Sequence, residues 1–161
     1  WFLHGQNRDE IDNCVICHNP NMTDAARRPA AQMPAESINF ATMIHRIHTG
    51  EEQPREYTVY GFGNVPHNYN HILLPPPATA ASCNLCHVNN SQQVPSEGVL
   101  SVVDPRGWLD PMPPTSAACL GCHASKEAAS HALAHTTRLG ESCTVCHGPN
   151  ATYSVNKVHA R

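Results

Sequence analysis

Cys143-Thr144-Val145-Cys146-His147 is one of four copies of a short motif in which two cysteines, separated by two residues, precede a histidine. The other copies are Cys14-Val15-Ile16-Cys17-His18, Cys83-Asn84-Leu85-Cys86-His87 and Cys119-Leu120-Gly121-Cys122-His123. All eight cysteines of the chain belong to a motif. The pattern C-x-x-C-H is typical of c-type haem attachment, in which both thiols bond the porphyrin edge and the histidine ligates the iron. The sequence therefore predicts four covalent haems, with proximal ligands His18, His87, His123 and His147.

Three other uses of paired cysteines fit the pattern less well. A zinc ribbon also uses C-x-x-C pairs, but it needs no histidine directly after the second cysteine. A thioredoxin-like redox motif would occur once, beside a βαβ pattern. A disulfide framework suits an exported chain, but it would not place a histidine after every second cysteine. Four complete motifs with no cysteine left over favour haem.

Length and composition favour one domain built around its cofactors. The 161 residues fit a single domain. Aromatic residues make up only 6% and hydrophobic residues 40%, so a core of side chains alone would be thin. The 14 prolines and nine glycines indicate long irregular stretches. We therefore expect one tetrahaem domain over residues 1–161, with a multihaem cytochrome c fold that is mostly irregular, has a few short α-helices and little β structure, and is organised around a haem core.

Net charge and hydropathy limit the kinds of binding partner and the cellular location that we expect. The formal net charge is −3 and no basic patch is present, which argues against a nucleic-acid partner. No apolar run approaches the length of a membrane span, and no signal peptide is visible, so we expect a mature chain or one excised from a longer protein. Because c-type haem attachment is completed outside the cytoplasm, we expect a periplasmic or extracellular location.

Two segments outside the motifs carry helical patterns. Residues 37–49 have apolar side chains at helical spacing, with Ser37 as a plausible N-cap and Gly50 after the last turn. An alanine-rich helix is predicted over residues 126–135, capped by Ser125. Of the remainder we expect a short β piece at 57–60, loops at 61–64 and 75–77, and a covering loop over 88–114.

Eight of the twelve histidines lie outside the motifs, whereas four haems need at most four second ligands. This surplus favours two histidines on most irons. His45 and His48 would share one face of the predicted helix, about 4.5 Å apart along its axis. Because two ligands of one iron approach from opposite sides, we expect these two to ligate different haems.

The sequence favours the other six histidines as iron ligands to different degrees. His131 and His135 share a helical face at i,i+4, and we favour His131 as the ligand and His135 as a bystander. His4 and His159 lie near the ends of the chain, where iron ligation would tie down segments that otherwise fray. His67 and His71 fall in a predicted loop, where a surface or propionate-bonding role is as good an interpretation as ligation.

A series of segments points to a known family. The segments are HGQNR (4–8), CVICHNP (14–20), MIHRIHTGEE (43–52), YTVYGFGN (57–64), PTSAACLGCHAS (114–125) and CHGPNATYSVNKVH (146–159). In this order they resemble one pentahaem electron-transfer domain of the outer-membrane decahaem cytochrome family of the OmcA/MtrC type. By this resemblance, distal iron ligands fall at His4, His45, His48, His131 and His159. Family domains carry a further C-x-x-C-H ahead of the HG element, so four motifs face five candidate distal histidines here, and one histidine is surplus.

The resemblance implies a function and a place. It implies electron transfer at the outer-membrane surface or outside the cell, with other cytochromes or extracellular acceptors such as metal oxides as partners. Irons saturated by two histidines exchange electrons rather than bind substrate, so we expect a low-potential electron carrier of anaerobic respiration and not an enzyme. Two alternatives stay open. One is a multihaem oxidoreductase with one open haem; the other is a filament subunit that associates end to end through head-to-tail haem contacts.

Overall fold

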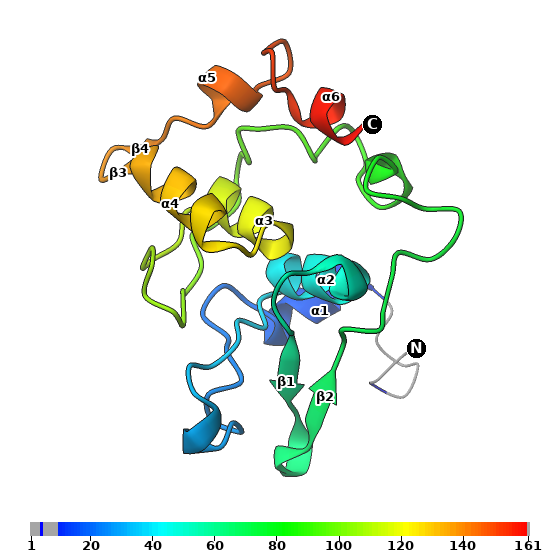
Figure 1. Ribbon diagram of the computed structural model, residues 1–161, viewed down its shortest axis with the longest axis vertical. Coiled ribbons are helices and arrows are strands. Elements are labelled where there is room, and N and C mark those ends of the chain that lie inside the picture. Colours follow the sequence, from blue (N-terminus) through cyan, green and yellow to red (C-terminus); the bar gives the residue numbers. More distant parts are fainter. Residues whose placement is uncertain (1–3, 5–9, 161) are drawn as a thin grey trace.

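The computed structural model describes residue 4 and residues 10–160 as short helices joined by long irregular segments (Figure 1). The α-helices are α1 (Ile11–Cys17), α2 (Phe40–His48), α3 (Pro114–Cys122), α4 (Lys126–Ala134), α5 (Thr144–His147) and α6 (Val155–His159). Two antiparallel hairpins pair β1 (Thr58–Tyr60) with β2 (Pro66–Asn68), and β3 (Thr136–Thr137) with β4 (Gly140–Glu141). Single 3-10 turns lie at Ala30–Gln32, Gly50–Glu52, Phe62–Asn64 and Cys83–Leu85. The expected fold class, mostly irregular with little β structure, is confirmed.

Helices α2 and α3 pack together near the centre of the molecule (Figure 1). Gly121 makes this approach close, because a Cβ at its position would lie 3.3 Å from the Cβ of His45. Beside this contact is a small hydrophobic core of Val102, Leu109, Met112 and Ala117, with Leu120 and Ala132 packed against it. The segment 88–114 has no helix or strand of its own before Pro114, as predicted, yet it supplies three of the four core side chains.

The N-terminal caps of α2 and α4 can be compared with those predicted from the sequence. Helix α4 has the predicted cap, since the Ser125 Oγ accepts a hydrogen bond from the Ala128 N–H at 3.2 Å. The predicted cap of α2 is wrong. Asn39 caps this helix by accepting from the Thr42 N–H at 3.1 Å, while the Ser37 Oγ accepts from the Asn39 side chain at 2.8 Å. Both residues are good capping types, and the two-residue difference follows from that side-chain bond.

Helix α3 takes its cap from a distant segment. The Glu141 carboxylate accepts hydrogen bonds from the Thr115 and Ser116 N–H groups at 3.0 and 2.7 Å, and from the Ser116 hydroxyl. These N–H groups belong to the first turn of α3. The N–H groups of a first turn have no carbonyl acceptor within their own helix. Because Glu141 lies two residues before Cys143, this cap joins the third motif to the fourth.

Asp24 connects the β1–β2 hairpin to the N-terminal part of the chain. This carboxylate is 2% exposed and accepts hydrogen bonds from the Glu36 N–H at 2.8 Å and the Tyr60 N–H at 2.9 Å. Arg28 forms an ion pair with it at 2.8 Å, and the same guanidinium also donates to the Thr58 carbonyl. A buried carboxylate is stable only when it is paired and fully hydrogen-bonded, and the Glu36 N–H, the Tyr60 N–H and the Arg28 guanidinium meet that requirement.

Replacement of Asp24 tests this connection. We expect Asp24→Ala to lower the free energy of unfolding by about 3–5 kcal/mol, because it leaves Arg28 buried without its partner. Denaturant unfolding of the haem-loaded protein measures the loss. The matched control is Asp12→Ala in α1, where the side chain is exposed and the expected change is within about 0.5 kcal/mol. Equal stability of the two variants would contradict the role assigned to Asp24.

Candidate haem sites

Each motif forms one helical turn with the same internal hydrogen bond. The histidine N–H donates to the carbonyl of the first cysteine at 2.9 Å in the first and fourth motifs and at 2.8 Å in the second and third. These turns lie at the ends of α1 and α3, in the 3-10 turn at Cys83–Leu85, and in α5. One turn therefore presents two thiols and an imidazole together. The eight cysteines are free thiols and are exposed or half-buried.

Each motif histidine lies opposite one histidine from elsewhere in the chain. The ring centres are 6.0 Å apart in one pair and 6.1 Å apart in the other three. The pairs are His4 with His18, His45 with His87, His123 with His159, and His131 with His147. The structure thus brings together all four predicted proximal ligands and four of the five histidines favoured as distal ligands.

This separation fits an iron atom between two imidazoles. Metal–imidazole bonds are about 2.0–2.1 Å long, and each bonding nitrogen lies about 1 Å from its ring centre, so two in-line ligands have ring centres about 6 Å apart. In the described residues no group of three or more His, Cys, Asp or Glu side chains could hold a metal ion. Two protein ligands suffice when a porphyrin supplies the other four, as in bis-histidine cytochromes.

The surface around the motifs also fits an apolar cofactor. The residues between the paired cysteines include Ile16, Leu85 and Val145, whose exposed fractions are 70%, 65% and 77%. An open cavity of about 780 Å³ borders Cys143 and is lined in part by Trp108, Pro111 and Arg138. At these three motifs porphyrin rings would cover the exposed apolar side chains, whereas Leu120 of the third motif packs against the hydrophobic core. The residues present therefore fit four c-type haems.

Hydrogen bonds orient most of the paired rings. The Nδ1 atoms of His18, His147 and His159 lie 2.8–2.9 Å from backbone carbonyls of Ile38, Tyr153 and Val155. His87 instead places Nδ1 3.1 Å from the Ser91 Oγ. A bond at Nδ1 leaves Nε2 as the nitrogen that can ligate a metal.

Burial keeps the central rings in the form that ligates iron. It lowers the pKa of His45, and the neighbouring His87 ring lowers it further. It also lowers the pKa of His123, with smaller contributions from His159 and His147. These rings are therefore neutral at neutral pH, as metal ligation requires. Burial, reinforced by Cys143 and Glu141, raises the pKa of the Cys119 thiol to about 11, so this sulfur is protonated until it is attached to a porphyrin.

Four candidate histidines face no motif histidine in the described residues. His48 lies on α2 with its Nδ1 3.0 Å from the Ile44 carbonyl. Its predicted ligation of a separate haem is untested, and the four pairs leave no motif histidine for it. His135 ends α4 with its ring centre 4.8 Å from that of His131. His67 lies in β2 rather than in a loop, with its ring against Gly61, where a Cβ would meet Nε2 at 2.9 Å. His71 is exposed in the segment that follows.

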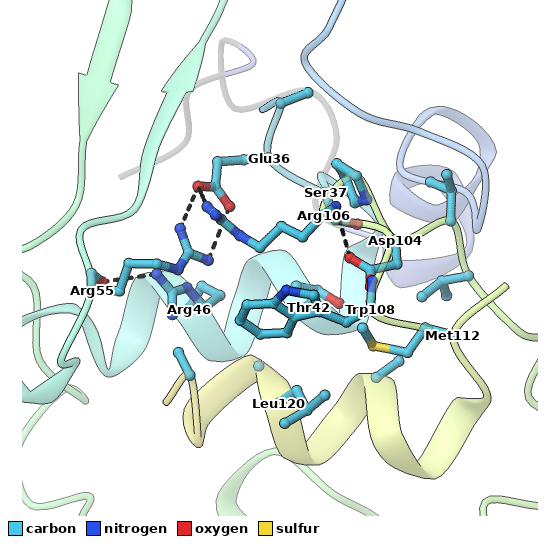
Figure 2. A pocket seen from close by; sticks show the side chains of 17 residues that line it. Glu36, Ser37, Thr42, Arg46, Arg55, Asp104, Arg106, Trp108, Met112 and Leu120 are labelled. Atoms are coloured by element: carbon cyan, nitrogen blue, oxygen red, sulfur yellow. Dashed lines mark hydrogen bonds and ion pairs between the residues drawn. The ribbon is translucent and has the colours of Figure 1, made fainter. Parts of the chain in front are cut away.

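A charged pocket is lined by Thr42 and Arg46 of α2, by residues of α3 and by the segment 102–108 (Figure 2). Its volume is about 60 Å³. Glu36 lies between Arg55 and Arg106, which it pairs with at 3.1 and 2.8 Å. Arg46 follows His45 in α2, is 1% exposed, and donates to the Gln53 side chain at 3.1 Å and the Arg55 carbonyl at 2.9 Å. This network anchors α2 and so fixes the backbone that carries His45.

A model of the outer membrane cytochrome MtrC/MtrF-like family, domains II/IV, matches residues 2–160. The chain belongs to this family. In the crystal structure of the outer membrane decaheme cytochrome OmcA, a similar region has 29% sequence identity and a TM-score of 0.52. The match covers 98% of this chain and 21% of that one, so the chain spans about a fifth of that relative's length. No curated protein matches the chain significantly.

Family membership confirms the resemblance seen in the sequence motifs. It makes the chain a multihaem c-type cytochrome domain of the electron-transfer class. The expected extracellular or outer-membrane location is confirmed on the same ground. Within the part of the chain that the structure describes, no helix has the length and apolar character needed to cross a membrane.

Removal of one distal histidine tests the pairing. We expect His159→Ala to convert one low-spin haem to the high-spin form, because His123 would keep its iron without a second ligand. Electron paramagnetic resonance (EPR) of the oxidised protein measures the conversion, and added imidazole should reverse it. His67→Ala is the control, since this ring packs on Gly61 and faces no motif histidine. An unchanged low-spin set in His159→Ala would rule out this pair.

Proposed function

We propose that the chain carries four covalently attached c-type haems, each held by two histidines, and passes electrons between other cytochromes and an extracellular acceptor such as a metal oxide. The observation that supports this most strongly is the equal spacing of four histidine pairs, at 6.0–6.1 Å. Each pair joins one motif to one further histidine, so the number of pairs equals the number of motifs.

The haem supplies an iron that gains or loses one electron without leaving its site. The chain's own residues then have three tasks. The cysteines would bond the porphyrin covalently, the paired imidazoles would ligate its iron, and the hydrogen bonds at Nδ1 hold the rings in place and would tune their strength as donors. Ligation by two histidines gives low reduction potentials, which suit anaerobic respiration.

The four histidine pairs also help to judge the two alternatives, an oxidoreductase and a filament subunit. An oxidoreductase needs an iron with an open position for substrate, and here each motif histidine has a facing partner. A filament that shares ligands between subunits needs a histidine from a second copy, whereas all four pairs come from one chain. The pairing therefore favours a simple electron carrier. The acceptor is inferred from the family alone, because the chain spans about a fifth of the decahaem relative.

The haem count is tested by intact mass. We expect the mature protein to exceed its 17.5 kDa chain by four haem masses, because four motifs and four facing histidines are present. A double variant, Cys83→Ala with Cys86→Ala, should lose exactly one of these increments. A wild-type protein with fewer than four would contradict the proposal.

A further inference from the structure

The hydrogen bonds at Nδ1 divide the four histidine pairs into two classes. Three pairs each contain a ring whose Nδ1 meets a backbone carbonyl: His18 at 2.8 Å, and His147 and His159 at 2.9 Å. Because an iron bonded at Nε2 leaves the ring proton on Nδ1, these rings donate to a strong acceptor.

The pair of His45 and His87 has no carbonyl acceptor at either ring. His87 bonds only the Ser91 Oγ, at 3.1 Å. Among the described residues, the His45 Nδ1 is the one histidine nitrogen that is sealed from solvent without a hydrogen-bond partner. The Ala41 carbonyl, one turn earlier, favours the protonated ring but does not meet Nδ1 in hydrogen-bond geometry. His48, on the same helix, does bond its carbonyl one turn earlier, at 3.0 Å.

The packing of α2 on α3 holds His45 in this state. Gly121 lies close to His45, since a Cβ at its position would be 3.3 Å from the His45 Cβ, which is a tight contact. The His45 Nδ1 is itself buried, so the missing bond belongs to a packed side chain and not to an exposed one. Water cannot replace the acceptor, because the nitrogen is buried.

Hydrogen bonding at Nδ1 controls how strongly a histidine donates to iron. A carbonyl acceptor draws the Nδ1 proton away and increases electron density at Nε2, which stabilises the ferric state and lowers the reduction potential. A hydroxyl is a weaker acceptor than an amide carbonyl, and an absent acceptor gives no such stabilisation. His45 and His87 are therefore the weakest donors of the four pairs.

The positive charge of Arg46 would also raise the reduction potential of a haem held by His45. Arg46 is buried next to His45, and its hydrogen bonds reach the neutral side chain of Gln53 and the carbonyls of Arg55 and Glu56. Glu36, a carboxylate of the same pocket, is paired with Arg55 and Arg106 instead (Figure 2). A buried positive charge without a carboxylate partner favours the less positive, ferrous state.

We propose that the haem between His45 and His87 has the highest reduction potential of the four, and that Ser91 is the positioning residue that tunes it. This inference rests on the proposed function, since it assumes that these two rings ligate one iron. His45 and His87 would hold this haem iron, which would accept one electron from a ferrous haem iron elsewhere in the chain, and that donor iron would become ferric. The Nδ1 protons stay on their rings. Electrons that enter the chain would therefore collect at this haem before they leave.

A redox titration followed by EPR tests the ranking. His45→Ala first identifies the signal, because it should remove one low-spin signal and create a high-spin one. In the wild-type holoprotein, we expect that same signal to be the first to disappear as the potential is lowered. His159→Ala is the matched control and should identify a signal that disappears later.

Substitution at Ser91 tests the cause without touching a ligand. Ser91 is exposed, so the fold tolerates its replacement. We expect Ser91→Asp to lower the midpoint of this haem, by about tenfold in its redox equilibrium or about 59 mV for one electron, and Ser91→Ala to raise it. Ser101→Ala, an exposed serine of the same segment, should leave it unchanged.

The results of these experiments distinguish a failure of this inference from a failure of the proposed function on which it rests. If His45→Ala creates no high-spin haem, the pairing itself fails and the proposed function falls with it. If the high-spin haem forms but the missing signal was not the first to be reduced, only the ranking is overturned. A midpoint that does not respond to Ser91→Asp overturns the role of Ser91.

Discussion

In the proposed arrangement, two imidazoles would ligate each haem iron from opposite sides, and the rest of the structure depends on this constraint. A motif histidine cannot meet this requirement with its own neighbours, so each site recruits a ring from another segment. His45 and His87 are 42 positions apart in the sequence, yet their ring centres are 6.0 Å apart and nearly parallel, at 11°. Four such pairs join the N-terminal region, α2, α4 and α6 to the motifs.

Carboxylates that accept backbone N–H groups, together with a small hydrophobic core, support these pairs. Long irregular segments leave many backbone N–H groups without partners from regular secondary structure, and each must be satisfied when buried. Asp24, Asp104 and Glu141 do this, accepting backbone N–H groups from the hairpin, from residues 106–109 and from the start of α3. A chain with small helices and a small core can thus hold defined positions for its ligands, while apolar cofactors provide the remaining packing.

The sequence predicted the motifs, the fold class and the helix at 126–135 because these depend on local patterns. The cap of α2 was misplaced by two residues, since a serine and an asparagine both suit that role and only the bond between them decides. The helices at the motifs were not predicted. Helices α1 and α5 are one or two turns long, and α3 is as long as α4 but has little amphipathic pattern. The sequence also could not show which further histidine faces which motif histidine. His131 and His135 share one helical face, and only the position of α5 shows that His131 lies opposite His147.

The most direct test of four histidine pairs is the EPR spectrum of the fully oxidised holoprotein. Facing rings that are nearly parallel split the iron orbitals strongly, whereas nearly perpendicular rings leave them close in energy and give a highly anisotropic low-spin signal. The His131 and His147 planes are 89° apart, and those of His45 and His87 are 11° apart. We therefore predict four low-spin haems, with one highly anisotropic signal and one clearly rhombic signal among them. A high-spin ferric signal in the intact protein, or a spectrum without the highly anisotropic species, would contradict the account.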